Sequence, residues 1–376
     1  MKILVTGGAG FIGTHLVRRL LHEGCAVTVL DNFSEQIHGQ THSLPEDLRH
    51  HVELRIGDVR DVSTVAASLK GQDAVVHLAA ETGTGQSMYE VLRYEDVNVH
   101  GTAVLMHCLA NNSSSNSQRR VVLASSRAIY GEGKYRCETH GSVYPDVRKT
   151  EHMLTGQFEP RCPVCQSACE VQPTNEDTVF KPSSFYGLTK QMQEQMTALC
   201  ANTMGFSAIA LRFQNVYGPG QSLKNPYTGI LAIFSSQARA NAKINIFEDG
   251  RESRDFVYID DVVEAIWRTI ATACLLAPAL NVGSGMRVSV NEVVREITTF
   301  FSSQSEVFVS GSFRQGDIRH SLADLRKVRE VLGFEPKWSF REGIQRFLEW
   351  TTLQEPDLQK YEFSLQEMRE RGLLHG

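Results

Sequence analysis

The sequence lacks any uninterrupted run of the roughly 20 apolar residues that a membrane-spanning helix requires. It also lacks an excess of positive charge, because 38 Lys and Arg residues stand against 43 Asp and Glu, for a formal net charge of −5. A partner with a phosphate backbone or an anionic lipid surface would call for a basic patch, so we expect no nucleic-acid and no membrane partner. The apolar N-terminus is interrupted by glycines and no small-residue cleavage site follows it, which argues against a signal peptide. We therefore expect a cytoplasmic protein.

What is present is ordinary for a globular enzyme. Hydrophobic residues make up 41% of the chain and charged residues 22%, and 376 residues suffice for two lobes with buried cores. Without an export signal, the eight cysteines are expected to be reduced thiols or metal ligands rather than disulfides. A short polar tract, NNSSSNS at 111–117, predicts a surface loop.

Short apolar runs alternate with helical patterns along the first 213 residues. This alternation predicts parallel strands joined by right-handed crossovers, that is, an α/β doubly wound sheet covered by helices on both faces. The pattern is broken over 132–176, a polar insertion that carries four of the eight cysteines. After Gly218-Pro219-Gly220 the elements become shorter, which predicts a smaller C-terminal α/β lobe over 214–376 that ends in a helical tail.

The segment TGGAGFIG follows the first predicted strand and begins the first predicted helix. Glycines at such a turn allow a sharp bend, a close approach of backbone to a pyrophosphate, and tight packing of helix on strand. Asp31 ends the second strand, where a carboxylate binds ribose hydroxyls and repels a 2′-phosphate, so NAD is favoured over NADP. The alternative is a simple glycine turn with a helix-capping Asp. The residues expected to bind NAD here are Gly7, Gly10, Phe11, Ile12, Gly13, Asp31 and Asn32.

Two further segments reach the carboxyl ends of strands, where ligands bind in such sheets. Asp58 and Val59 follow the third strand, and the segment Leu78, Ala79 and Ala80 ends the fourth. We expect both segments to contact the cofactor. Asp58 could equally well cap the helix predicted to begin near residue 61.

Tyr186 and Lys190 lie four residues apart at the start of a long predicted helix, so both side chains share one helical face. A lysine ammonium, together with a positively charged nicotinamide, would lower the pKa of the phenol and make it a general base. Ser126, at the end of a predicted strand, could donate a hydrogen bond to the same substrate oxygen. A tyrosine and a lysine at this spacing also arise by chance, so the pair indicates a catalytic site only together with the glycine turn and Ser126.

Further motifs are HLAA at 77–80, NVHGT at 98–102, SSRAIYG at 125–131, YGLTK at 186–190, RFQNVYGPG at 212–220 and RDFVYIDDV at 254–262. Together with the segments described above, they resemble the extended short-chain dehydrogenase/reductase family of NAD-dependent sugar-nucleotide epimerases and dehydratases. The resemblance covers nearly the whole chain and adds Asn98 to the cofactor site. It implies that Ser126 rather than Ser125 is catalytic. It also implies a homodimer formed through the helices at 88–111 and 186–203.

The resemblance also assigns the substrate site to a nucleotide sugar. It implies that Asn215, Arg254 and Arg314 bind the diphosphate and that Asp317 binds the sugar or nucleotide end. The loop that carries Glu81 and Gln86 lines the sugar pocket in relatives. For any single arginine, a solvated surface position is the more common alternative. The resemblance thus divides the chain into an NAD-binding domain over 1–213 and a mainly substrate-binding lobe over 214–376.

Both reaction types of this family begin with oxidation at C4 of the sugar. Family dehydratases resemble one another in a carboxylate directly after the catalytic Ser or Thr, whereas this chain has Arg127-Ala128 there, which favours a 4-epimerase over a 4,6-dehydratase. A catalytically inert NAD-sensing regulatory protein is a third hypothesis, and the intact set of Ser126, Tyr186 and Lys190 argues against it.

The insertion offers two pairs of metal ligands, Cys137-x2-His140 and Cys162-x2-Cys165, with Cys169 as a possible substitute. Such pairs are typical of structural zinc sites, although incidental reduced thiols or a redox Cys-x2-Cys are alternatives. The Cys-x2-His-Gly and Cys-Pro-x-Cys segments resemble those of bacterial dTDP-L-rhamnose 4-epimerases. This resemblance implies conversion of dTDP-L-rhamnose to dTDP-6-deoxy-L-talose.

Overall fold

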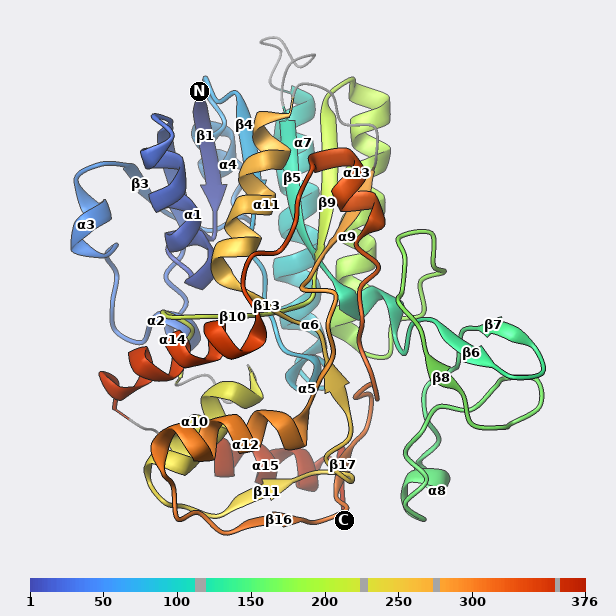
Figure 1. The fold of residues 1–376 in the computed structure, drawn as a ribbon. Helices are drawn as coiled ribbons and strands as arrows, with labels where there is room; N and C mark the ends of the chain where they lie inside the picture. Colours follow the sequence, from blue (N-terminus) through green and yellow to red (C-terminus); the bar gives the residue numbers. More distant parts are fainter. Residues whose placement is uncertain (112–119, 224–228, 273–277, 356–358) are drawn as a thin grey trace.

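The computed structural model describes residues 1–111, 120–223, 229–272, 278–355 and 359–376 (Figure 1). Most of the surface loop predicted at 111–117 therefore lies outside the described residues. Among the residues that are described, no helix combines the length and the apolar character needed to cross a bilayer.

A parallel sheet forms the centre of the molecule, as the sequence predicted. In the described part of the chain it has seven strands, ordered β14-β9-β5-β4-β1-β2-β3. The strands are β1 (Lys2–Thr6), β2 (Ala26–Asp31), β3 (Glu53–Ile56), β4 (Ala74–His77), β5 (Arg120–Ser126), β9 (Ser207–Phe213) and β14 (Ala279–Val282). The chain begins at β1, adds β2 and β3 on one side, and then crosses to β4 and the strands beyond it. The order thus reverses between β1 and β4, and crevices at such a point bind ligands.

Helices cover both faces of this sheet (Figure 1). The helices α1 (Phe11–His22) and α11 (Ile259–Ala271) pack together on one face, with the largest apolar core beneath them. On the other face lie α4 (Val62–Ser68), α7 (Gly101–Asn111) and α9 (Phe185–Met204), over a second core. A π-helical turn at Glu95–His100 joins α7 to the short α6 (Val91–Tyr94). The periodic helical patterns at 11–22, 61–69 and 186–203 correspond to α1, α4 and α9.

The segments after residue 213 build a lobe below the carboxyl ends of the strands (Figure 1). Its helices are α10 (Ile230–Arg239), α12 (Val290–Phe301), α14 (Phe340–Thr352) and α15 (Gln359–Glu370), and α13 (Arg326–Leu332) lies nearer the sheet. Its short strands are β10 (Asn215–Tyr217), β11 (Ile244–Ile246), β12 (Ser253–Arg254), β13 (Phe256–Tyr258), β15 (Val288–Ser289), β16 (Val307–Val309), β17 (Phe313–Arg314) and β18 (Leu374–His375). The chain returns from this lobe to the first sheet, because β14 is buried against β9 and α11 covers the face beside α1. The large sheet therefore draws on residues beyond 213, although the functional division at that residue stays a prediction.

The insertion at 132–176 extends from the side of the molecule (Figure 1). It contains a three-stranded antiparallel sheet, ordered β7-β6-β8, from β6 (Tyr135–Cys137), β7 (Gly141–Val143) and β8 (Glu170–Val171). A single helical turn, α8 (Thr150–Met153), follows β7. Strands of two or three residues are too short to show a hydrophobic period, so the sequence predicted no regular element here.

Candidate active site

A cavity of about 530 Å³ opens at the carboxyl ends of the parallel strands, between the sheet and the C-terminal lobe. This volume is within the range of small-molecule binding sites. The structure brings most of the predicted site residues to its walls, although they come from separate parts of the sequence. Those that line it are Gly7, Gly10, Phe11, Ile12, Gly13, Asp31, Asn32, Val59, Leu78, Ala79, Ala80, Glu81, Ser126, Tyr186, Lys190, Asn215, Arg254, Arg314 and Asp317.

Three predicted residues lie behind the cavity wall. The Asn98 side chain accepts a hydrogen bond from the Glu81 amide (2.8 Å) and donates to Thr189 Oγ1 (3.0 Å), so it braces the wall between two elements. The Gln86 amide pairs with that of Gln36, at 3.0 and 3.1 Å. Neither side chain is among the groups that line the cavity.

The third is Asp58, which binds Arg60 and Asn32 rather than capping a helix. Its carboxylate accepts two hydrogen bonds of 2.8 Å from the Arg60 guanidinium and one of 2.9 Å from Asn32 Nδ2. The Arg60 hydrogen bonds lower the pKa of Asp58 to about 2. The cap of α4 is Asp61, whose side chain accepts from the amides of Ser63 and Thr64. Asp58 therefore acts on the cavity by fixing Asn32, which lines it.

The glycine turn leaves backbone open to the cavity. Gly7 has a φ of +69°, and a Cβ there would lie 2.7 Å from the Ala79 amide nitrogen. A Cβ at Gly13 would lie 2.4 Å from the Gly7 carbonyl oxygen, so α1 can pack on the turn only without a side chain. No side chain caps the N-terminus of α1 at Gly10, and the residues of the first turn of this helix line the cavity. These features fit a pyrophosphate at the helix N-terminus.

Asp31 lines the part of the cavity where the adenosine end of a dinucleotide is expected. Its two carboxylate oxygens accept hydrogen bonds from the Ala9 amide (3.0 Å) and the Phe33 amide (2.9 Å), and the side chain is 7% exposed. Asp31 thereby fixes the glycine turn relative to β2 while it lines the cavity. The residues present fit NAD at this position.

Ser126, Tyr186 and Lys190 meet on one wall. Ser126 ends β5, and its hydroxyl, which accepts from the Ala128 amide at 3.2 Å, lies close enough to the Tyr186 phenol to lower that phenol's pKa. Lys190 Nζ lies 5.9 Å from the centre of the Tyr186 ring and donates to the Ala124 carbonyl (2.9 Å). A Cβ at Gly187 would lie 2.5 Å from the Ala128 carbonyl oxygen, so this glycine permits α9 to approach the end of β5.

Arg127 brings a positive charge to the phenol that the sequence motifs did not indicate. Burial raises the pKa of Tyr186, and the hydrogen bond from Ser126 and the positive charge of Arg127 oppose that rise. Burial also lowers the pKa of Lys190 to about 7, which reduces the charge it carries at neutral pH. The guanidinium of Arg127 lines the cavity, and within the described chain it has no hydrogen-bond or ion-pair partner. In the sequence, position 127 indicated only that no carboxylate follows Ser126.

The lobe contributes positive charge to the opposite wall. Arg254 donates to the carbonyls of Ser253, Ile318 and Arg319 at 2.9 to 3.0 Å, which fixes its guanidinium beside the cavity. Arg314 Nε lies 3.0 Å from a carboxylate oxygen of Asp317, so these two predicted ligands form an ion pair. Arg254 is therefore the better-placed cation for a diphosphate, since it forms no ion pair within the described residues.

Two further residues line the cavity although no motif in the sequence indicated them. Glu252 lies two residues before Arg254 in the chain, and burial raises the pKa of its carboxyl to about 7. Tyr361 comes from α15 in the predicted tail, which closes the cavity from below. Periodicity could predict that helix but not its place against the site.

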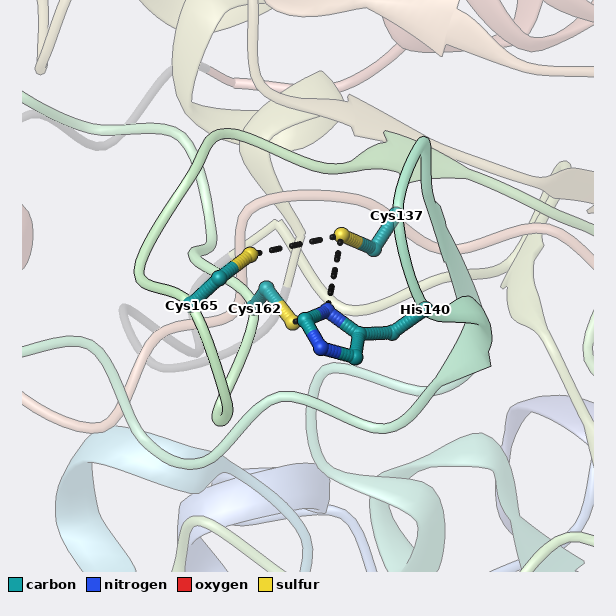
Figure 2. A group of neighbouring side chains, drawn as sticks. All are labelled: Cys137, His140, Cys162 and Cys165. Atoms are coloured by element: carbon teal, nitrogen blue, oxygen red, sulfur yellow. Dashed lines mark hydrogen bonds between the residues drawn. The ribbon is translucent and has the colours of Figure 1, made fainter.

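The insertion gathers four potential metal ligands (Figure 2). The ligand atoms of Cys137, His140, Cys162 and Cys165 all lie within 4.8 Å of one another. Cys169 lies outside this group, although it is buried beside it, and its thiol contacts the Ser167 carbonyl at 3.7 Å. The structure thus gathers the four residues that the sequence favoured, without the possible substitute.

Comparison with known proteins extends these observations. Residues 3–283 match the NAD dependent epimerase/dehydratase family. The chain is 39% identical to the dTDP-L-rhamnose 4-epimerase of Burkholderia thailandensis over 93% of this chain and 94% of that one. It is 31% identical to the UDP-glucose 4-epimerase of Mycolicibacterium smegmatis, over 93% and 98% respectively. Two solved structures are each 29% identical to this chain, and each comparison covers 94% of this chain and 99% of the other. One is the UDP-glucose 4-epimerase of Thermotoga maritima with UDP-glucose, with a TM-score of 0.76. The other is MoeE5 in complex with UDP-glucuronic acid and NAD, with a TM-score of 0.75.

Proposed function

The chain belongs to the NAD-dependent epimerase/dehydratase family, and on that premise we propose that it is a sugar-nucleotide 4-epimerase that interconverts dTDP-L-rhamnose and dTDP-6-deoxy-L-talose. The observation that carries the chemistry is the meeting of Ser126, Tyr186 and Lys190 on one cavity wall. The choice of sugar is supported by the 39% identical relative and by the Cys/His pattern of the insertion.

NAD would lie along the carboxyl ends of β1, β2 and β4. Gly7, Gly10 and Gly13 would admit its pyrophosphate, and Asp31 would bind the adenosine ribose. When bound, NAD would supply the hydride acceptor for oxidation at C4 of the sugar and the hydride donor for its reduction. Asn98 and Asp58 would act from behind the wall by fixing Glu81 and Asn32.

The protein's own groups would move the proton of the C4 hydroxyl. Tyr186 as a phenolate would accept that proton, while the Ser126 hydroxyl donates a hydrogen bond to the same oxygen. Arg127 favours the phenolate, since its charge lowers the phenol's pKa against the effect of burial. The phenol would then return the proton after the sugar has presented its other face.

The lobe would hold the rest of the substrate still. Arg254, with Asn215, would bind the diphosphate, and the Arg314–Asp317 ion pair would contact its sugar or nucleotide end. Asn215 would donate to the diphosphate through its Nδ2 group, whereas its Oδ1, which is buried and has no hydrogen-bond partner within the described residues, would accept from a hydroxyl of the ligand. A diphosphate held at a fixed point would allow the sugar to turn while remaining bound.

A 4,6-dehydratase would need an acid and a base beyond this set. The residue after Ser126 that faces the cavity is Arg127, and the next, Ala128, is buried outside the lining. A guanidinium cannot exchange a proton at neutral pH, so this position favours epimerisation.

A homodimer and a cytoplasmic location remain proposals. The dimer is supported by exposed apolar side chains on α9, at Leu188, Met192 and Leu199, and by Leu92 on the adjoining α6. Residues 188, 192 and 199 fall on one helical stripe, as a helix–helix interface between two copies requires.

The test is product analysis with a panel of nucleotide sugars. Purified protein would be incubated with NAD and, in turn, dTDP-L-rhamnose, UDP-glucose and UDP-glucuronic acid, and each product identified by NMR. We expect the C4 epimer of dTDP-L-rhamnose. A keto-deoxysugar formed from UDP-glucose would indicate a dehydratase instead, and epimerisation of a UDP-sugar in preference to dTDP-L-rhamnose would contradict the proposed substrate.

A further inference from the structure

The insertion at 132–176 has little apolar core of its own. Its buried cluster consists of Tyr135, Cys137, Val143, Cys162 and Cys169. Three of these five side chains are cysteines, and a segment this small rarely stays folded without a metal or disulfides. The Cys137 and Cys165 sulfurs lie 3.6 Å apart, far beyond the roughly 2.05 Å of a disulfide. The four cysteines of the insertion are free thiols, so no disulfide joins them.

The spacing of the four ligand atoms matches a tetrahedral zinc site. With Zn–S near 2.3 Å and Zn–N near 2.0 Å, tetrahedral geometry places neighbouring ligand atoms about 3.5–3.8 Å apart. The measured separations are 3.6 Å from Cys137 Sγ to His140 Nδ1, 3.6 Å from Cys162 Sγ to the same nitrogen, and 3.6 Å from Cys137 Sγ to Cys165 Sγ. The other three separations do not exceed 4.8 Å, so a small side-chain adjustment would bring all four atoms into contact with one ion.

Two backbone turns present these ligands in pairs (Figure 2). Cys137 ends β6 and His140 precedes β7, so one pair belongs to a hairpin. In the other turn, the Cys162 amide donates to the Ser167 carbonyl (2.9 Å) and the Gln166 amide to the Cys162 carbonyl (3.0 Å). Gln166 has a φ of +59°, a conformation that a tight turn imposes on it. Each turn thus holds its two ligands on the same side before any ion binds.

We propose that Cys137, His140, Cys162 and Cys165 bind one structural zinc ion, and that the insertion closed by this ion positions the substrate-binding segment 313–320. The zinc site is independent of the proposed function, whereas the positioning of segment 313–320 rests on the proposed function of the cavity.

The positioning half follows from the contacts of Arg148, an insertion residue that is almost fully buried. Its guanidinium donates two hydrogen bonds of 2.8 Å to Glu248 and one of 2.7 Å to the Asp317 carbonyl, and it pairs with Glu132 at 3.1 Å. Glu248 and Asp317 both line the cavity. One insertion side chain therefore ties two parts of the cavity wall together.

Further insertion residues hold the same segment. Glu159 accepts from Arg319 Nε at 2.8 Å, and Phe313 packs in a small core with Met153 and Phe158 of the insertion. Arg314, between these anchors, is one of the two arginines of the lobe expected to bind the substrate. Loosening the insertion should therefore release the segment that carries Arg314 and Asp317, while the NAD-binding turn stays as it is.

Metal content tests the first half. Untagged protein purified without added zinc would be analysed by mass spectrometry of its metals, with about one zinc per chain expected. Cys165→Ser should lose most of that zinc, whereas Cys169→Ala, the matched control outside the ligand group, should keep it. If Cys165→Ser fails to fold, zinc release from the wild-type protein by a chelator, and recovery of its melting temperature on re-addition, give the same information. Protein without stoichiometric zinc, or equal zinc loss in Cys169→Ala, would overturn the site.

Hydrogen–deuterium exchange tests the second half without using activity. Removal of zinc from the NAD-loaded protein should speed amide exchange over 313–320 and leave residues 7–13 unchanged. With dTDP-L-rhamnose, zinc-free protein should show a KM raised about tenfold with kcat within a factor of two. Unchanged exchange over 313–320 after verified zinc loss would overturn the positioning role. If no nucleotide sugar is turned over by the zinc-loaded protein, the proposed function fails, while the zinc and exchange results still decide this inference.

Discussion

The hydroxyls of Ser125 and Ser126, neighbours at the end of β5, bind different partners. Ser125 donates to the buried carboxylate of Glu194, which is also paired with Arg212 at 2.8 Å, whereas Ser126 accepts from the Ala128 amide and lowers the pKa of the Tyr186 phenol. One serine thus belongs to a structural ion pair and the other to the proposed reaction site.

Substitution of the two serines should therefore have opposite effects. We expect Ser126→Ala to lower kcat about 10²- to 10³-fold with an unchanged melting temperature, since it removes one hydrogen-bond donor at the reacting oxygen. Ser125→Ala should retain most of the activity and lose about 1–3 kcal/mol of stability, because Glu194 loses a buried partner. Steady-state kinetics and thermal melts of both variants check this. The reverse pattern would assign the reaction to Ser125.

Tyr186→Phe separates an epimerase from an inert NAD-binding protein. Loss of the phenol oxygen removes the proposed acid and base, so kcat should fall about 10²- to 10⁴-fold while NAD binding and the melting temperature stay close to those of the wild type. Product formation measured by NMR, with NAD content measured on the same preparation, checks this. Unchanged turnover would remove Tyr186 from the mechanism and leave the regulatory hypothesis open.

Local patterns in the sequence predicted the parts of the site that depend on one strand and one turn. The glycines at 7–13 and the strand that ends at Asp31 are of this kind, because close backbone approach demands glycine whatever the surroundings. The proposed zinc ligands were also indicated, since the two residues of each pair lie within four positions of sequence. The contact of Arg148 with Glu248 is between residues 100 apart in sequence, and no local pattern indicates it. Tyr361 reaches the cavity only because α15 packs beneath it.

Replacing Arg127 should change the pH profile as well as the rate. Because its charge lowers the pKa of Tyr186, Arg127→Gln should raise that pKa and move the acidic limb of kcat/KM to higher pH, by about one unit. At neutral pH this corresponds to a loss of roughly tenfold. Arg127→Lys, which keeps a positive charge, should restore most of the wild-type profile. A lower rate with an unmoved limb in Arg127→Gln would mean that the arginine binds the substrate rather than tuning the phenol.

The apolar stripe on α9 predicts the oligomeric state. Leu199 is 68% exposed and Leu92 on α6 is 83% exposed, so a charge at either position should disrupt a dimer formed there. Light scattering coupled to gel filtration should give a dimer for the wild type and a monomer for the double variant Leu92→Glu, Leu199→Glu. Leu353→Glu is the matched control, since Leu353 is 81% exposed at the end of α14. A monomeric wild type would contradict the proposal.

Glu252 should make the stability of the protein depend on pH near neutrality. Burial raises the pKa of its carboxyl to about 7, above the value near 4.5 of an unfolded glutamate. Between these two values the folded state holds more protons than the unfolded state, so this group's contribution to stability is complete below pH 4.5 and is lost as the pH rises through 7. In Glu252→Gln the decline between pH 5 and 8 should be smaller by about 2–5 °C in melting temperature. Thermal melts at constant ionic strength with saturating NAD measure it, and Glu330→Gln, which removes the same charge from an exposed position, should decline as the wild type does. Parallel curves for wild type and Glu252→Gln would mean that Glu252 ionises at an ordinary pH, with its charge compensated by Arg254 and Arg319.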